Sequence, residues 1–214
     1  MDKDRLRKVL IENYRKIIEY ITVSDPGIKN ILVTSAEPEE GRTTTAAYLA
    51  VASAFLKPNK RILLVDLDLR HSLLHRMFGL DGERGIREII VDTLTIKDVV
   101  CRTHVANLTV IPGGIEALDF PEALQSKTLI HFLRDVKTHY DMAFYDSPAT
   151  NRYVDAHLLS SLMDGVLLVV RSGRSKRDEV VAAKSEIHSM GGKVIGAIMN
   201  DFRNPIPSFL YRRL

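Results

Sequence analysis

Short apolar runs alternate with amphipathic segments along most of this chain, and this alternation limits the fold more than any single motif does. The runs expected to form strands are 30–35, 60–68, 108–114, 141–148, 164–173 and 193–200. They are apolar almost throughout, as is typical of strands covered on both faces of a sheet. Helical patterns fill 43–56, 126–140, 154–163 and 175–190. This order predicts a three-layer α/β/α fold around a mostly parallel central sheet with right-handed crossovers.

An amphipathic helix is predicted before the first strand. Apolar side chains recur at three- and four-residue spacing between Leu6 and Ile21, charged residues lie between them, and turn-forming residues follow at 24–27. We therefore expect a helical arm, residues 1–28, ahead of a main domain, residues 29–214.

Composition limits the class of protein. The 214 residues are 45% hydrophobic and 27% charged, and no apolar run approaches the ~20 residues that a membrane-spanning helix needs. A net charge of +3 is too small to indicate nucleic-acid binding. The single cysteine, Cys101, cannot form an internal disulfide, which is typical of a reducing cytosol. We therefore expect a cytoplasmic protein without a membrane span or a nucleic-acid partner.

The segment 35–45, SAEPEEGRTTT, joins the first predicted strand to a helix in the manner of a phosphate-binding loop. The usual pattern is G-x-x-x-x-G-K-[ST], and here Ala36 and Arg42 replace the first glycine and the lysine. Such a loop points backbone N–H groups at phosphate oxygens, at the positive end of a helix. An ordinary helix start with threonine capping would contain similar residues, so the loop alone leaves both interpretations open.

Aspartates follow two other apolar runs. Asp66 and Asp68 end the second predicted strand, two residues apart and hence on one face, and Asp146 ends the fourth. Ligands of parallel α/β sheets bind at the carboxyl ends of the strands, and Mg²⁺ takes carboxylates together with phosphate oxygens. Each aspartate alone would be an ordinary strand end. Three of them beside a loop of this form favour a nucleotide site.

The combination of motifs resembles the bacterial tyrosine kinases that accompany capsule and exopolysaccharide export, a P-loop family related to the ParA and MinD ATPases. The resemblance rests on TSAEPEEGRTTTAAYLA, LLVDLDLR and MAFYDSPA, and it extends from about residue 12 to residue 200. It implies a P-loop NTPase fold and phosphoryl transfer from ATP, with Mg²⁺, to a tyrosine of a neighbouring copy. It also implies a homo-oligomer and a membrane polysaccharide co-polymerase, or chain-length regulator, as a partner that would hold the protein at the inner face of the membrane.

The resemblance also implies roles for single residues. Asp66 would orient or deprotonate the tyrosine hydroxyl, Asp68 would support the geometry of metal and phosphate, and Arg42 would neutralise phosphate charge. The implied nucleotide contacts are Glu40, Gly41, Arg42, Thr43, Thr44 and Asn200. The implied metal ligands are Thr43, Asp68 and Asp146.

Three departures from the family pattern bear on activity. Arg42 replaces the loop lysine, Glu39 replaces a usual glycine, and Tyr211 stands alone where the family has a C-terminal tyrosine cluster. Arginine keeps the positive charge, whereas a carboxylate a few ångströms from the phosphates would cost about 1–4 kcal/mol unless it rotates to solvent.

Two alternatives to an active kinase stay open. One is a degenerate homologue that senses nucleotide or serves as a scaffold in the same export machinery. The other is a MinD- or ParA-like ATPase, which is disfavoured because residues 35–38 lack the early lysine of those proteins.

Overall fold

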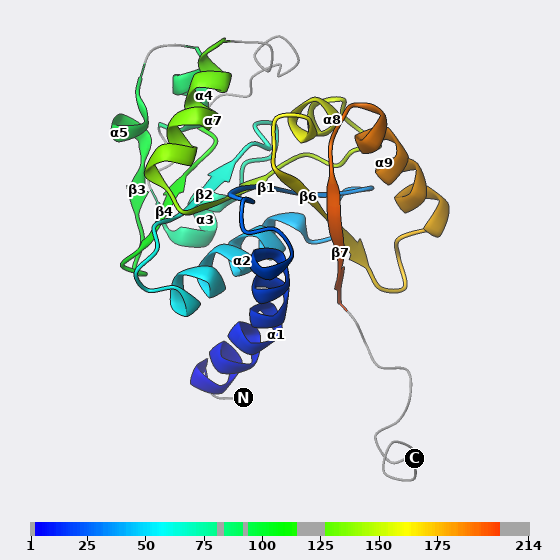
Figure 1. Ribbon diagram of the computed structural model, residues 1–214, viewed down its shortest axis with the longest axis horizontal. Coiled ribbons are helices and arrows are strands. Elements are labelled where there is room, and N and C mark those ends of the chain that lie inside the picture. The colour runs from blue at the N-terminus through cyan, green and yellow to red at the C-terminus, as the bar shows by residue number, and fades with distance from the viewer. Residues whose placement is uncertain (1–2, 81–83, 92–93, 115–126, 202–214) are drawn as a thin grey trace.

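The central sheet has seven strands in the order β3-β4-β2-β5-β1-β6-β7. The computed structural model describes residues 3–80, 84–91, 94–114 and 127–201 (Figure 1), so Tyr211 lies outside the described residues. All neighbouring strands are parallel except β3, which runs antiparallel to β4. The strands are β1 (Asn30–Ser35), β2 (Ile62–Asp66), β3 (Cys101–Arg102), β4 (Leu108–Ile111), β5 (Met142–Asp146), β6 (Gly165–Arg171) and β7 (Val194–Asn200).

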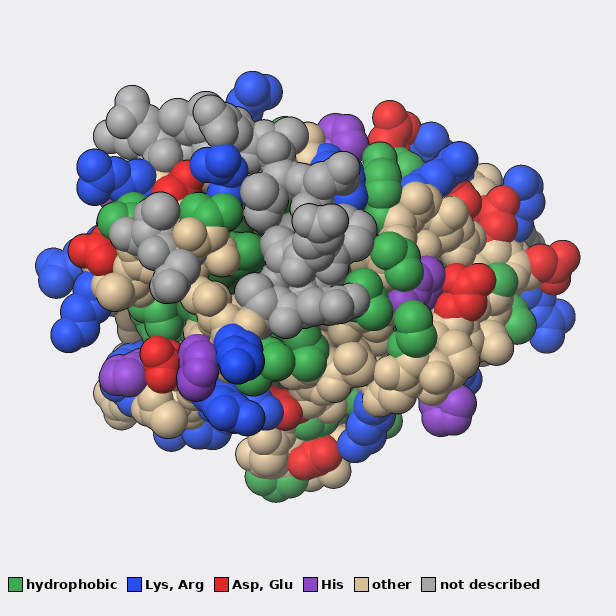
Figure 2. Space-filling model, turned by 90° about the horizontal axis from the view of Figure 1, so that it is seen from above, with side chains coloured by type: hydrophobic (Ala, Val, Ile, Leu, Met, Phe, Trp, Pro, Cys, Tyr) green, Lys and Arg blue, Asp and Glu red, His purple; other side chains and the backbone are tan. Residues whose placement is uncertain are grey.

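Helices cover both faces of the sheet, which confirms the three-layer prediction (Figure 1). One buried cluster joins the sheet to α1 (Lys3–Ser24), α2 (Arg42–Leu56) and α3 (Leu74–Phe78). The other cluster lies on the opposite face and contains side chains of α4 (Ile86–Ile90), α5 (Ile96–Val99), α7 (Lys127–His139), α8 (Asp155–Ser160) and α9 (Arg177–Ser189). Seen from above, basic and acidic side chains are interspersed on the visible face (Figure 2).

The predicted N-terminal helix is present as α1, and it packs on α2 (Figure 1). Ile18 and Ile21 are buried in the same cluster as the alanines of α2. The ring of Tyr14 meets that of Tyr48 edge-on, with centroids 5.7 Å apart. No helix among the described residues is long and apolar enough to cross a membrane.

The shortest elements were not predicted. The strand β3 has two residues, and α3, α4 and α5 have four or five each. Segments of that length are too short to show a hydrophobic period. The six strands that were predicted as apolar runs are all present.

Candidate functional site

Three strands bring the predicted acidic residues to one edge of the sheet. The strand β5 lies between β2 and β1, and the register places Asp146 beside both Asp66 and Val33. The strand β2 ends at Asp66, so Asp68 lies just beyond the strand rather than on its face as expected. Asp66, Asp68 and Asp146 are all buried. The three carboxylates therefore lie together at this edge, where Asp68 meets Arg42 of the loop after β1, and their roles in nucleotide and metal binding stay predictions.

The loop after β1 is shaped by two residues with left-handed backbone, Glu39 (φ 62°) and Gly41 (φ 91°). A Cβ on Gly41 would lie 2.0 Å from the Asn200 side-chain nitrogen, so only glycine fits there. The Asn200 amide donates a hydrogen bond to the Glu40 carbonyl at 2.9 Å. Asn200 therefore lies at the loop, and its amide is engaged by the loop backbone. Thr44, a predicted nucleotide contact, is exposed in the first turn of α2.

The Glu39 carboxylate points away from the loop interior. Its side chain is 73% exposed and pairs with Arg174 at 2.8 Å. The Glu39 carbonyl accepts a hydrogen bond from Arg171 at 3.1 Å. The repulsion expected from the sequence is therefore relieved by the outward rotation of the side chain.

The neighbouring carboxylate, that of Glu40, is turned into the protein rather than toward solvent. It is buried, and it accepts hydrogen bonds from the backbone N–H of Glu37, at 3.0 Å, and from the Ser175 hydroxyl. These contacts of Arg171, Arg174 and Ser175 with the loop were not predicted from the sequence. Nothing local in the sequence signals them, because they depend on β6, which their segment follows, being the parallel neighbour of β1.

Arg42 is the buried cation of the site. Its Nη2 lies 2.5 Å from Asp68 Oδ2, and the two side chains are only 12% and 2% exposed. The Arg42 Nε has no hydrogen-bond partner among the described residues. The residue at the lysine position of the loop therefore pairs with the second aspartate of LLVDLDLR.

Asp66 organises the segment that leads into α3. Its Oδ2 accepts hydrogen bonds from the Ser72 hydroxyl at 2.8 Å and from the backbone N–H groups of Leu73 and Leu74 at 3.1 and 3.2 Å. Among the described residues, its Oδ1 accepts only the 3.2 Å bond from the Asp68 N–H. Burial raises the pKa of Asp66 to about 6, with the hydrogen bond from Ser72 acting against the shift. Asp66 Oδ2 thus holds the segment before α3 in place, whereas Oδ1 can accept a further hydrogen bond or a proton.

Asp146 has an oxygen that suits a metal ion. Its Oδ1 is buried with no hydrogen-bond partner among the described residues. Burial raises the pKa of Asp146 well above its ordinary value and the charge of Asp66 adds to the rise, whereas a hydrogen bond with Thr43 opposes it. A carboxylate in this state is stabilised by a nearby cation.

The donor set fits Mg²⁺ bound together with phosphate. The carboxylates of Asp68 and Asp146 and the Thr43 hydroxyl supply hard oxygen donors at the loop. The described side chains form no cage of three or more His, Cys, Asp or Glu ligands. Mg²⁺ does not need one, because it keeps several waters and takes one or two carboxylates together with phosphate oxygens.

A second ion pair fastens the two loops that flank the carboxylates. Arg70, which follows β2, pairs with the buried carboxylate of Asp155 at the start of α8. Its guanidinium also lies 4.5 Å from the centre of the Tyr153 ring. The sequence drew attention to Arg70 but not to Asp155 or Tyr153, because nothing local links the two segments.

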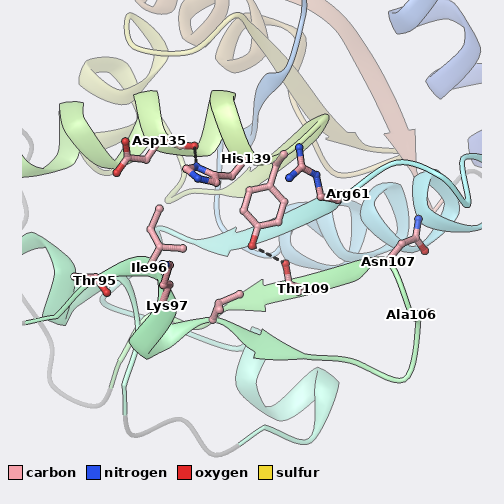
Figure 3. A pocket seen from close by; sticks show the side chains of 11 residues that line it. Arg61, Thr95, Ile96, Lys97, Ala106, Asn107, Thr109, Asp135 and His139 are labelled. Atoms are coloured by element: carbon pink, nitrogen blue, oxygen red, sulfur yellow. Dashed lines mark hydrogen bonds between the residues drawn. The ribbon is translucent and has the colours of Figure 1, made fainter.

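Two of the cavities lie at opposite ends of the strands. A cavity of 440 Å³ adjoins the loop and is lined by Glu37, Pro38, Glu39, Glu40, Arg152, Arg174, Lys176 and Glu179. A cavity of 540 Å³ lies between α5, α7 and β4 (Figure 3). Its lining includes Arg61 and Asn107, which directly precede β2 and β4, so it lies at the amino ends of the strands. Of these two cavities, only the first is lined by residues of the phosphate loop.

Comparison with known proteins agrees with this geometry. Residues 28–175 match the AAA domain family. The tyrosine-protein kinase YwqD of Bacillus subtilis is 33% identical over 192 residues, which cover 88% of this chain and 80% of that protein. The solved structure of the chimerical protein CapA2B2 is similar with a TM-score of 0.84 and 29% identity, over 90% of this chain and 85% of that one.

A more distant solved structure shares the fold alone. The septum site-determining protein MinD of Pyrococcus horikoshii, complexed with Mg-ADP, is 21% identical with a TM-score of 0.69. The match covers 86% of this chain and 76% of that one.

Proposed function

This chain belongs to the AAA-domain P-loop proteins and, among them, to the bacterial tyrosine-protein kinases, and on that premise we propose that it transfers the γ-phosphoryl group of ATP to a tyrosine. The observation that carries the proposal is the gathering of the buried carboxylates of Asp66, Asp68 and Asp146 at the phosphate loop, where Arg42 pairs with Asp68.

Substrate binding falls to the loop and to the start of α2. Backbone N–H groups at a helix N-terminus attract phosphate oxygens, and Gly41 lets the backbone come close to them. Arg42 adds a full positive charge that can contact phosphate with two nitrogens. In phosphoryl transfer such positioning and charge neutralisation supply most of the acceleration.

Mg²⁺, when bound through Thr43, Asp68 and Asp146, would neutralise charge on the phosphate oxygens. Asp66 Oδ1 accepts the proton of the tyrosine hydroxyl as the phenolic oxygen bonds to the γ-phosphorus. The bond from that phosphorus to the bridging oxygen breaks, and ADP leaves. Because burial raises the pKa of Asp66 only to about 6, the carboxylate is ionised at neutral pH and can act as the base.

The setting proposed for this reaction is a homo-oligomer in the cytoplasm, held at the inner face of the membrane by a polysaccharide co-polymerase. The acceptor would be a tyrosine of a neighbouring copy. Tyr145 is excluded as an acceptor because it is fully buried in β5, whereas Tyr211 stays a candidate outside the described residues.

A nucleotide-sensing subunit without kinase activity is the second candidate. It is favoured by the arginine at the lysine position of the loop, because a planar guanidinium is bulkier than an ammonium group and would hold the phosphate differently. A sensor would bind Mg-ATP and change its stability without transferring phosphate.

Incubation of the purified protein with γ-labelled ATP and Mg²⁺ tests the proposal. Label on tyrosine is expected, and replacement of Asp66 by asparagine should reduce it by about 100-fold, the usual contribution of a general base. A rise in melting temperature with Mg-ATP but no label would establish the sensor instead. Absence of both, in a folded protein, would contradict nucleotide binding altogether.

A further inference from the structure

The ion pair between Arg42 and Asp68 joins the two groups that the proposed function would use separately. Arg42 would serve phosphate and Asp68 would serve the metal ion, yet here they contact one another at 2.5 Å. His71 lies 3.6 Å from the other Asp68 oxygen, but it is 64% exposed and carries charge only when protonated. Arg42 is therefore the main buried counter-ion of Asp68.

Breaking a buried ion pair by removing one partner is strongly unfavourable, because the other charge is left without compensation. A divalent cation that takes Asp68 alone leaves Arg42 uncompensated. A nucleotide that takes Arg42 alone does the same to Asp68. When both arrive, phosphate replaces Asp68 as the partner of Arg42, and the cation replaces Arg42 as the partner of Asp68.

We propose that the Arg42–Asp68 ion pair couples cation binding to nucleotide binding, so that the two are taken up as a complex and only weakly one at a time. This inference rests on the proposed nucleotide site, and it specifies which form of the nucleotide the site selects. Coupling of this kind is reciprocal, so each ligand must raise the affinity for the other by the same factor. A factor of about ten or more is expected from one buried ion pair.

Titration with Mn²⁺, a spectroscopic substitute for Mg²⁺, measures the cation half of the exchange by electron paramagnetic resonance. The wild-type protein should bind Mn²⁺ weakly alone and at least tenfold more tightly with a non-hydrolysable ATP analogue. Replacing Arg42 by methionine should tighten Mn²⁺ binding without nucleotide by about fivefold or more and reduce the coupling. Unchanged Mn²⁺ affinity in a folded Arg42→Met protein would overturn the proposal.

Binding of a fluorescent ATP analogue in EDTA measures the nucleotide half and does not depend on the Arg42 variant. Asp68→Asn should release Arg42 and tighten metal-free binding by about tenfold. Asp66→Asn is the matched control, because it makes the same change two residues away, at a side chain that accepts its hydrogen bonds from residues 68 and 72–74. It should tighten binding by less than about threefold. Equal effects of the two variants would show charge alone at work and overturn the proposal.

The proposed nucleotide site and the proposed coupling are tested separately by these measurements. If the wild-type protein does not bind the ATP analogue even with Mg²⁺, the proposed nucleotide site is wrong. The Mn²⁺ titration without nucleotide still tests whether Arg42 competes for Asp68. If the wild-type protein binds the analogue but neither Arg42→Met nor Asp68→Asn acts as described, only the coupling is wrong.

Discussion

Glu39 shows how a single side chain adapts the phosphate loop. Its backbone has φ 62°, where a residue with a Cβ is strained by on the order of 1 kcal/mol. Its carboxylate would repel a triphosphate if it faced inward, but the ion pair with Arg174 holds it outward. An exposed pair of this kind is worth little by itself. The Glu39–Arg174 ion pair therefore matters because it holds the Glu39 carboxylate away from the phosphates, rather than for the stability it adds.

Removal of the Arg174 side chain should allow the Glu39 carboxylate to repel the phosphates of the nucleotide. We expect Arg174→Ala to weaken binding of Mg-ATP by about three- to tenfold, because the freed carboxylate can turn toward the phosphates. Glu39→Gly should change affinity by less than about threefold in the wild type and should restore it in the Arg174→Ala background. Fluorescence titration of the four proteins measures the interaction. Arg177→Ala removes the same charge outside the Glu39 ion pair, and an equal loss there would contradict the argument.

At the scale of elements, the end of β7 supports the phosphate loop. The two meet where Asn200 donates to the Glu40 carbonyl and its amide lies over Gly41. The first turn of α2 continues directly from this contact, through the hydrogen bond from the Thr45 N–H to the Gly41 carbonyl at 2.9 Å. The loop is therefore shaped by a strand about 160 residues away in sequence.

Gly41→Ala should disrupt that junction. The new Cβ would meet Asn200 at 2.0 Å and the backbone would be strained at φ 91°, so we expect a loss of about 2–4 kcal/mol in stability and at least a tenfold loss of nucleotide affinity. Gly173→Ala is the control, because φ is 73° there but a Cβ meets nothing within 4 Å. It should cost about 1 kcal/mol. Urea denaturation gives both values, and similar losses in the two variants would show that Asn200 yields easily.

The strands and helices with a long hydrophobic pattern could be predicted from the sequence, and those too short to show such a pattern could not. The apolar runs predicted β1, β2 and β5 because a strand covered on both faces has to be apolar throughout. The strand β3, only Cys101–Arg102, gave no pattern. At the site, Asp66 and Asp146 could be predicted because strand ends are visible in sequence. The pairing of Glu39 with Arg174 could not, since it depends on which strand lies beside β1.

At the scale of the whole molecule, two central strands of the sheet hold buried acidic groups at their carboxyl ends. Asp66 and Asp146 lie side by side on β2 and β5, between the helices of both faces. Of these helices, α2 connects the site to the arm, because α1 packs on it and the ring of Tyr14 meets that of Tyr48 edge-on. Charge at the site therefore acts on the stability of the entire domain rather than on a loose surface segment.

The free energy of unfolding should consequently fall as the pH rises through the range in which the Asp66 carboxyl loses its proton. The pKa of Asp66 is raised from 3.8 to about 6, chiefly by burial, so the folded protein holds a proton that the unfolded chain has already lost. The stabilisation from that proton is complete below about pH 4 and is lost as the pH rises through about 6. We expect Asp66→Asn to remove this part of the pH dependence. The difference in unfolding free energy between variant and wild type should then shift by about 1–3 kcal/mol in favour of the variant between pH 4 and pH 7.

Urea denaturation at constant ionic strength across that range measures the difference. The dependence of this free-energy difference on pH is diagnostic. The hydrogen bonds that asparagine loses shift the difference by the same amount at every pH. Asp141→Asn is the control of opposite sign. A backbone hydrogen bond from Arg61 lowers the pKa of Asp141, so its stabilisation is present above the unfolded pKa and lost as the pH falls. A flat difference for Asp66→Asn would mean that Asp66 is ionised in the fold at pH 4, and the base of the proposed reaction would then be too weak to accept the tyrosine proton efficiently.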